Sequence, residues 1–381
     1  MQKNYKENHL KSYAVKTINS KGRLFKEREG YIRSPYQRDR DRIIHSSSFR
    51  RLKHKTQVFV NTVGDHYRTR LTHSMEVSQI SRTLARFLGL NEDLCETLSL
   101  SHDLGHTPFG HAGEEVLNQC MKNHGGFNHN IQTLRIVTFL ENKYYKFFGL
   151  NLTIETLDGL LKHNGPVLDL FPYKKILNNN FFNKKIIFYN SPSLEAQVSS
   201  ISDDIAYNNH DLEDGLRANL FTINKLREIP LLYRIINKHI KNKTRYRKEI
   251  IINQIVRQLI NLMVVDVINT TNRNLKNYEP KSIKDIYKAD HLIVDFSKKM
   301  KNLDKQIKSF LSLNMYNHKK VKSNTNKGEK VIKGLFRYLL KNPKKYINRR
   351  ALVENSKERS IADFIAGMTD RFAINLYNKI K

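Results

Sequence analysis

Apolar residues recur at intervals of three and four positions along most of the chain after residue 70. One such stripe runs from Val77 to Leu88 and stops near Gly89. This spacing places the apolar side chains on one face of a helix, which can be buried against a neighbouring element. The same pattern predicts a second helix over 93–103 and a third that begins after Pro192.

Helical patterns also cover much of the remaining chain, over 131–148, 216–228, 248–270, 285–313 and 330–341. Strand-like alternation is scarce, and its best example is the short run from Lys185 to Tyr189. The polar segment from Ser323 to Gly328 predicts an exposed loop. The chain is therefore predicted to be all-α, and we find no internal repeat.

Composition narrows the class of protein. The 381 residues include 18 Tyr and 19 Phe, which argues against a disordered chain. Two cysteines, Cys95 and Cys120, cannot build a disulfide framework, so we expect a reducing cytoplasm. The chain shows no apolar leader and no run of about 20 apolar residues, so we expect neither secretion nor a membrane partner.

The net charge of +31 invites a polyanionic partner, such as nucleic acid or polyphosphate. The alternative is a codon-biased composition in which Lys fills the surface. Twelve basic residues and one acid, Glu329, lie between Tyr316 and Arg350. Charge alone does not decide between these readings, so the placement of reactive side chains matters more.

Histidines are concentrated in one part of the chain, since six of the 15 lie between His73 and His129. His73 and His102 extend the apolar faces of two predicted helices, and Asp103 follows His102 directly. A carboxylate buried without a partner is so unfavourable that it pairs or binds a metal. Inward imidazole and carboxylate groups together therefore predict a site for a divalent cation.

A further anionic ligand is expected from the third helix, where Asp203 and Asp204 are adjacent. Asp203 shares its helical face with small residues such as Ala196 and Ala206, which favours close packing and an inward position. Asp204 falls with polar residues, including Asn208. Periodicity alone leaves the choice between the two aspartates open.

His73, His102-Asp103 and Asp203 form an H…HD…D pattern, and longer segments around them are more specific. These segments are Arg38 to His45, Phe49 to Leu52, Thr56 to Phe59, Asp65 to Ser74, His102 to His111, Asp203 to Asp211 and Asp363 to Asp370. In them the chain resembles the dGTPase-type deoxynucleoside triphosphohydrolases, a branch of the HD-domain metal-dependent phosphohydrolases. The resemblance is strong over 20–215 and clear over 362–373, and little of 216–360 is matched.

The resemblance implies an all-α fold with an HD-domain helical core and additional C-terminal helices. We expect an Arg-rich N-terminal segment, 1–60, to pack on a core formed by 61–215. Residues 216–381 would then form a helical C-terminal region that completes the active site and makes oligomer contacts.

The resemblance also assigns four metal ligands, His73, His102, Asp103 and Asp203. Two imidazoles and two carboxylates leave coordination positions open for water and a phosphate oxygen, as a hydrolytic site requires. Zn, Mn, Fe and Mg all remain candidates, because mixed nitrogen and oxygen ligands discriminate poorly between them.

The activity that the resemblance implies is hydrolysis of a dNTP to the deoxynucleoside and inorganic tripolyphosphate. The departing 5′-oxygen of the sugar is a poor leaving group and benefits from a general acid. His106, His111 and His129 are the predicted catalytic residues for this proton transfer.

Five residues are predicted to bind the substrate. Arg70 suits the triphosphate, since Arg can hold phosphate oxygens in a bidentate manner. By resemblance, Gln57 and Val58 contact the deoxyribose, and Gln57 suits its 3′-hydroxyl. Tyr207 and Asp211 follow Asp203 along the same side of its helix and extend towards the substrate.

Two alternative functions remain open at this stage. One is a different HD phosphohydrolase, acting on nucleoside monophosphates, cyclic nucleotides or guanosine polyphosphates. The other is a single-stranded nucleic-acid-binding protein that uses the basic stretch at 316–350 and has a vestigial HD site. The resemblance further implies a homo-oligomer and allows a dNTP effector.

Overall fold

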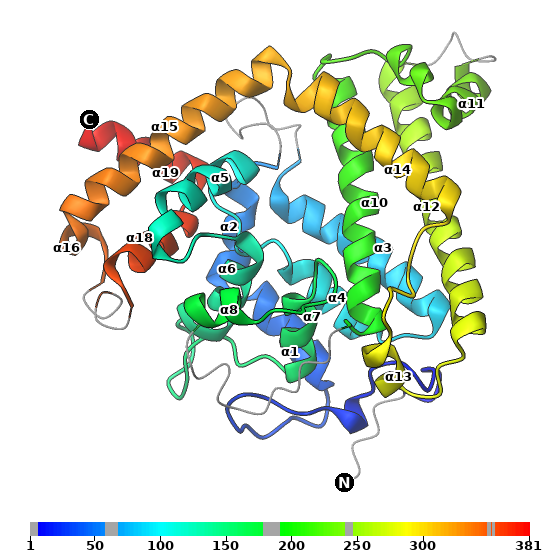
Figure 1. Ribbon diagram of the computed structural model, residues 1–381, viewed down its shortest axis with the longest axis horizontal. Helices are drawn as coiled ribbons and strands as arrows, with labels where there is room; N and C mark the ends of the chain where they lie inside the picture. The colour runs from blue at the N-terminus through cyan, green and yellow to red at the C-terminus, as the bar shows by residue number, and fades with distance from the viewer. Residues whose placement is uncertain (1–6, 58–67, 178–190, 241–246, 349–351, 353–354) are drawn as a thin grey trace.

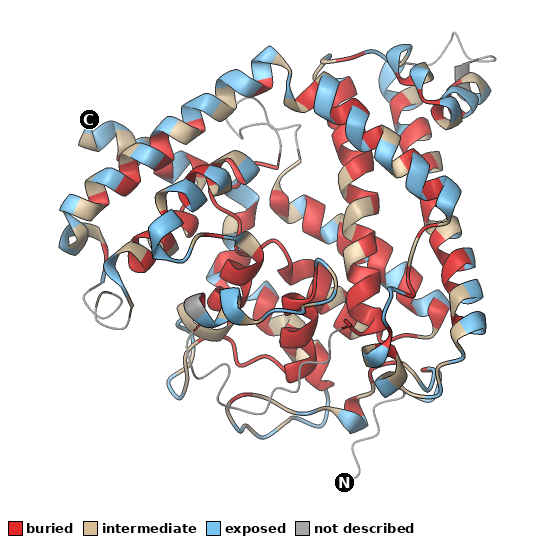
Figure 2. Ribbon diagram, viewed as in Figure 1, coloured by how far each residue is buried: buried red, intermediate tan, exposed pale blue. Residues whose placement is uncertain are grey.

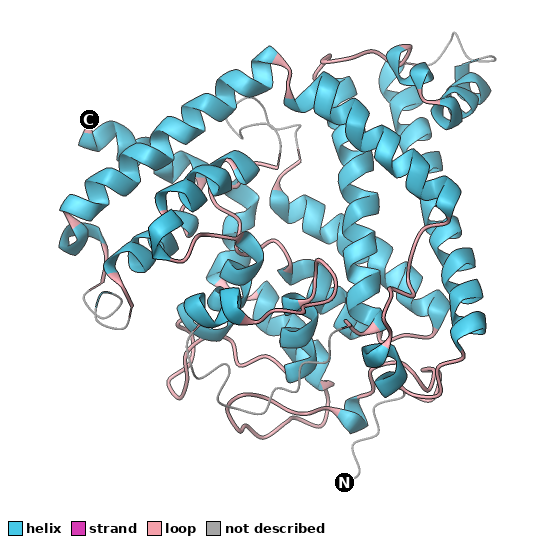
Figure 3. Cartoon of the chain, in the orientation of Figure 1, coloured by secondary structure: helices cyan, strands magenta, loops and turns pink. Residues whose placement is uncertain are grey.

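The computed structural model describes residues 7–57, 68–177, 191–240, 247–348, 352 and 355–381. Within this part of the chain, helices are joined by loops and no strand is present (Figure 3). The prediction of an all-α fold is therefore confirmed. The predicted strand at 185–189 lies outside the described residues.

The described residues form 17 α-helices, several of them joined by short 3-10 or π-helical turns (Figure 1). They are α1 (Pro35–Ile44), α2 (Ser47–Arg51), α3 (Arg70–Leu88), α4 (Glu92–Ser101), α5 (Gly110–Cys120), α6 (His129–Arg135), α7 (Ile154–Leu161), α8 (Phe171–Ile176), α10 (Leu194–Arg217), α11 (Pro230–Ile240), α12 (Lys248–Tyr278), α13 (Ile283–Lys288), α14 (Lys298–Leu311), α15 (Lys319–Lys341), α16 (Pro343–Tyr346), α18 (Lys357–Ala366) and α19 (Asp370–Ile380).

Helices α3, α4 and α10 pack against one another and form the frame of the molecule (Figure 1). A capping box between Thr69 and Thr72 starts α3, and Gly89 ends it in the left-handed conformation, with φ of 67°. The hydroxyl of Ser193 caps α10 by accepting a hydrogen bond from the Ala196 N–H. Helix α4 ends at Ser101, so His102 and Asp103 lie just beyond its C-terminal end.

The buried apolar side chains form three clusters, and the buried parts of the helices face one another (Figure 2). One cluster includes Leu84 and joins α3, α10, α12 and α14. A second includes Leu98 and joins α1, α4, α6 and α7. The third includes Leu117 and packs α5 against the C-terminal helices α15, α18 and α19. The C-terminal helices therefore pack against a helix, α5, that comes much earlier in the sequence.

The prediction of an exposed loop at 323–328 is wrong, because these residues lie within α15. The apolar stripe of α15 begins at Val321 and continues through Val331 and Leu335, all buried, so the polar stretch is one solvated turn of an amphipathic helix. Gly328 faces inward, where an added Cβ would lie 2.6 Å from Cγ of Phe109.

Three predicted helices are interrupted by tertiary contacts that periodicity does not detect. The pattern over 131–148 ends at a π-helical turn, Ile136–Leu140, after which the Glu141 carboxylate accepts the Ser48 N–H at 2.7 Å. The pattern over 216–228 is broken at Asn219, which is left-handed with φ of 53°. Between α13 and α14, the Gln197 side chain accepts the N–H groups of residues 293 and 294 at 2.9 and 3.0 Å.

Helix α12 is long and apolar enough to cross a membrane, judged by length and composition only. One of its faces packs against α10 and α11 through buried residues such as Leu259 and Met263. Its hydropathy alone is therefore weak evidence for a membrane span.

The predicted division into an N-terminal segment, an HD-domain core and a C-terminal region, with boundaries after residues 60 and 215, stays a prediction.

Candidate active site

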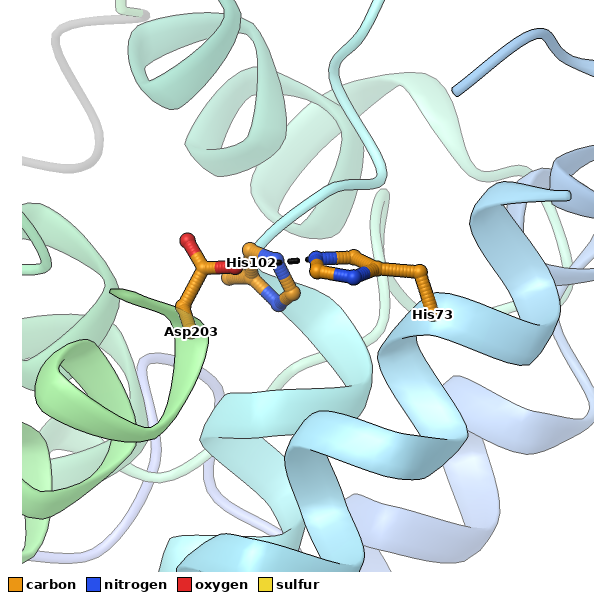
Figure 4. Close-up of side chains that lie close together, drawn as sticks. All are labelled: His73, His102 and Asp203. Carbon is orange, nitrogen blue, oxygen red and sulfur yellow. Dashed lines mark hydrogen bonds and ion pairs between the residues drawn. The ribbon is translucent and has the colours of Figure 1, made fainter. Parts of the chain in front are cut away.

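Helices α3, α4 and α10 bring His73, His102 and Asp203 together (Figure 4). Each offers one ligand atom, and these atoms lie within 4.8 Å of one another. His73 Nε2 is 2.9 Å from Asp203 Oδ1, and the His73 side chain is 1% exposed. Asp204 points elsewhere and pairs with Lys308 at 2.9 Å. The geometry therefore brings Asp203, of the two adjacent aspartates, to the histidines.

His102 is oriented by a hydrogen bond to its own helix. Its Nδ1 lies 2.7 Å from the Ser99 carbonyl oxygen, so Nδ1 carries the proton and donates it. The other nitrogen, Nε2, lies 3.5 Å from Asp103 Oδ1 and 3.6 Å from Asp203 Oδ1. This buried Nε2 has no hydrogen-bond partner. An imidazole nitrogen that lies between two carboxylates without a hydrogen-bond partner gives a set of donor atoms that fits a divalent cation.

Asp103 is buried just beyond the end of α4, and its two carboxylate oxygens contact different neighbours. Its Oδ2 accepts a hydrogen bond from Arg70 at 2.9 Å, and its Oδ1 lies 3.2 Å from His106 Nε2. Burial alone would raise the pKa of Asp103, but the neighbouring His102, Arg70 and His106 hold that pKa well below its usual range. Asp103 is therefore an ionised carboxylate that lies close to both His102 and His106.

His163 also borders this cluster. Its Nε2 is 3.5 Å from Asp203 Oδ2, and its ring stacks on that of His102 with centroids 5.0 Å apart. His163 was missed because it comes from the end of α7, remote in sequence from the other histidines.

A second cluster forms where the loop after α4 meets α5 and α6. His106 stacks on His129 with ring centroids 4.0 Å apart, and His111 contacts both rings edge-on. His129 Nδ1 lies 2.9 Å from the Glu114 carboxylate, and His111 Nδ1 lies 3.6 Å from it. The three predicted catalytic histidines therefore lie together. His106 and His129 are largely enclosed, whereas the His111 side chain is 61% exposed.

Glu114 is the residue of this cluster that sequence reasoning missed. Burial alone would raise its pKa, but the adjacent His111 and His129 lower that pKa below its ordinary value. It also accepts the His129 N–H at 2.8 Å, so it fixes both the backbone and the ring of that residue. The available signal was the His111-x-x-Glu114 spacing, which puts both side chains on one face of α5.

The predicted phosphate ligand, Arg70, is at the start of α3 between the two clusters. Its side chain is 2% exposed, and one nitrogen donates to Asp103 while Nε has no hydrogen-bond partner. Gln57 is also buried. Its backbone oxygen and Arg70 NH2 both lie close to Gly110, so Gln57 and Arg70 are neighbours. The side-chain oxygen Oε1 of Gln57 has no partner either. Val58 lies outside the described residues.

Tyr207 and Asp211 lie on α10, beyond Asp203, and a third side chain joins them. The Tyr316 hydroxyl, from the turn between α14 and α15, donates to Asp211 Oδ2. Burial is the main cause that raises the pKa of Asp211 to about 7, and burial likewise raises the pKa of Tyr207. Tyr316 was missed because it belongs to the region that resembled no known family.

Comparisons with known proteins identify two matched regions of the chain. Residues 70–208 match the HD domain, and residues 294–379 match the phosphohydrolase-associated domain. The first match contains all four predicted ligands. The second covers part of the region in which little resemblance was visible. The fold and these matches define a phosphohydrolase of the HD-domain class.

Several relatives carry the name deoxyguanosinetriphosphate triphosphohydrolase-like protein. The one from Pelagibacter ubique is 60% identical over 357 residues, which is 94% of this chain and 96% of the relative. That from Bartonella henselae is 47% identical over 382 residues, covering 97% and 94% respectively. That from Parvibaculum lavamentivorans is 45% identical over 381 residues, covering 97% and 95%. The chain therefore belongs to the deoxyguanosinetriphosphate triphosphohydrolase-like family, as its sequence motifs predicted.

Proposed function

We propose that this protein hydrolyses deoxynucleoside triphosphates to the deoxynucleoside and inorganic tripolyphosphate. The observation that carries the proposal is the convergence of His73, His102 and Asp203, with the unpartnered His102 Nε2 directed at two carboxylates. The names of the relatives support a nucleoside triphosphate as substrate. The cytoplasm is the proposed location, and both cysteines are free thiols in keeping with it.

The proposed ligands of the cation are His73, His102, Asp103 and Asp203, and its identity is open among Mn, Mg, Zn and Fe. A divalent cation bound there supplies Lewis-acid chemistry, which neutralises phosphate charge and makes water more acidic. The 2.9 Å hydrogen bond that Arg70 donates to Asp103 keeps this carboxylate ionised and oriented towards the other proposed ligands. The Arg70 nitrogens that Asp103 does not use suit a phosphate oxygen of the substrate.

The proposed source of the proton for the departing 5′-oxygen is the cluster of His106, His111 and His129. With His129 Nδ1 held by Glu114 at 2.9 Å, the remaining nitrogen of His129 is the one available for proton transfer. Glu114 also lies 3.6 Å from His111 Nδ1, so one carboxylate contacts both rings. Asp103 connects this cluster to the cation ligands through His106.

Sugar recognition is assigned to Gln57, Val58, Tyr207 and Asp211. The free Oε1 of Gln57 and the unpartnered Oδ1 of Asp211 are buried acceptors that a sugar hydroxyl would satisfy. An acceptor left unpaired in the free protein and paired in the complex favours binding of a substrate that carries the hydroxyl.

The proposal is tested by product analysis with each dNTP and with Mn, Mg, Zn or Fe. Release of tripolyphosphate and deoxynucleoside is the expected result. Release of pyrophosphate with a nucleoside monophosphate would refute it, and preferential turnover of monophosphates, cyclic nucleotides or guanosine polyphosphates would favour another HD phosphohydrolase. Mixed dNTPs test for an effector, and size-exclusion chromatography with light scattering tests the proposed homo-oligomer.

A second, compatible proposal concerns single-stranded nucleic acid. Helix α15 carries eight basic residues and one acid, Glu329, and its basic side chains are all exposed. Lys322, Lys330, Lys333, Arg337 and Lys341 follow helical spacing along one side. Steeply salt-dependent binding of a thymidine oligonucleotide, weakened by Lys330→Glu with Lys333→Glu, is the expected result. Binding unaffected by this double change would contradict it.

A further inference from the structure

One buried carboxylate connects the C-terminal region to the loop that carries the proton-transfer histidines. Asp370, the first residue of α19, is 1% exposed. Its Oδ2 accepts the Thr56 N–H at 2.9 Å and the Thr56 hydroxyl, and its Oδ1 accepts the Phe109 N–H at 3.1 Å. The segment before Gln57 and the loop before His111 are therefore held by the same side chain.

Lys55 makes a second connection between the same segments. Its buried Nζ donates to the His106 carbonyl oxygen at 2.5 Å and to the carbonyl oxygen of Ala366, the last residue of α18, at 2.8 Å. Removing either side of such a buried hydrogen bond leaves a polar group unpaired, which destabilises the arrangement. The backbone of His106 is thus fixed relative to the C-terminal helices.

The loop itself adopts a conformation that its sequence does not favour. Phe109 is not glycine, yet it has φ of 63°, and Gly110 follows with φ of 59°. A left-handed conformation is unfavourable for a residue with a Cβ, because the Cβ then crowds the following carbonyl oxygen. Contacts from outside the loop must therefore hold it, and they come from Asp370 and from α15, where Gly328 leaves room for the Phe109 ring.

We propose that Asp370 is a positioning residue for the reaction. It holds the loop over 106–111 so that His106 and His111 meet Glu114 and His129 in the geometry required for proton transfer. Its own contacts are with Thr56 and Phe109, so it acts through the loop and not on the substrate. This inference rests on the proposed function.

The test is Asp370→Asn, which keeps the size of the side chain. The two carboxylate oxygens serve three donors, whereas the amide has one oxygen, so its NH2 must face a donor. We expect kcat to fall between about 10-fold and 100-fold, because small displacements of reacting groups have effects of this size. KM should change less than threefold and bound metal should be unchanged, while the Phe109 amide exchanges with deuterium faster.

Asp285→Asn is the matched control. Asp285 also accepts two backbone N–H groups and one hydroxyl, from Lys281 and Ser282, but it caps the remote helix α13. It should leave kcat and loop exchange unchanged. Lys55→Met is a second variant in case Asp370→Asn fails to fold, and it should release the His106 backbone with the same signature.

The inference is overturned if Asp370→Asn keeps the kcat of the unaltered protein, or if exchange in the loop does not change. It is also overturned if activity is lost only in proportion to bound metal, or if Asp285→Asn has the same effect. Absence of tripolyphosphate release by the unaltered protein would refute the proposed function instead. The exchange comparison would still show whether Asp370 holds the loop.

Discussion

Glu195 offers a stability prediction whose size can be worked from the structure. Its carboxyl group is fully buried near the start of α10, where Oε1 accepts the N–H groups of Val15 and Asn91 at 2.9 and 3.2 Å. The other oxygen, Oε2, has no partner. Burial is the main cause that raises the pKa of Glu195 from 4.5 to about 7. The folded protein therefore favours the neutral form of this group.

The sign of the pH dependence follows from this direction. Because the folded state binds the proton more tightly than the unfolded state, the stabilisation is fully present below pH 4.5 and is lost as the pH rises to about 7. At about 1.4 kcal/mol for each pH unit, the total loss is roughly 3 kcal/mol. Glu195→Gln keeps an oxygen for Val15 and Asn91 but cannot ionise, so it should remove this loss.

The assay is urea denaturation followed by circular dichroism between pH 5 and pH 8. Glu195→Gln should be more stable than the unaltered protein by about 2–3 kcal/mol at pH 8, with a difference that shrinks towards pH 5. Glu115→Gln, which removes an exposed carboxylate, is the control and should show no such trend. A difference between Glu195→Gln and the unaltered protein that is the same at both pH values would refute the reasoning.

Three further changes test the candidate site and the packing of α15. His102→Ala should abolish metal binding and lower turnover by at least about 100-fold, and retention of metal in elemental analysis would argue against the ligand assignment. Glu114→Gln should lower kcat by about 100-fold with metal content intact, since it removes the charge that orients His129, and unchanged steady-state kinetics would contradict this role. Gly328→Ala should lower stability by about 1–3 kcal/mol in thermal unfolding, because its Cβ would lie 2.6 Å from Cγ of Phe109. An unchanged melting temperature would contradict that close packing.

Local periodicity predicted the helical class, which is confirmed, whereas the HD-domain core was expected only from the resemblance of the motifs to a known family. In the stripe from Val77 to Leu88, the side chains of Val77, Ile80, Leu84 and Leu88 are buried as expected, but Phe87, which the pattern also placed on the buried face, is exposed. The continuous helix α15 was missed because a polar stretch over 323–328 looks the same in a loop and on the outside of an amphipathic helix. Only the packing of Gly328 against Phe109 distinguishes the two.

The candidate site was predictable where its residues are adjacent in sequence. His102 and Asp103 are such a pair, and the family motifs supplied the choice of Asp203 that periodicity had left open. Glu114, His163 and Tyr316 could not be found in this way. Each contributes through a contact with a side chain from another helix, and such contacts follow from tertiary packing.

The contacts of Asp370 also bear on when the site can form during synthesis. Asp370 comes long after the HD-domain match, which ends at residue 208, so it is synthesised well after that region. Domains fold from the N-terminus as they are synthesised, and the HD-domain core is complete long before α19 exists. The loop around His106 has no C-terminal support during that interval. The cluster of His106, His111 and His129 is therefore expected to reach its final arrangement only after α19 has been synthesised.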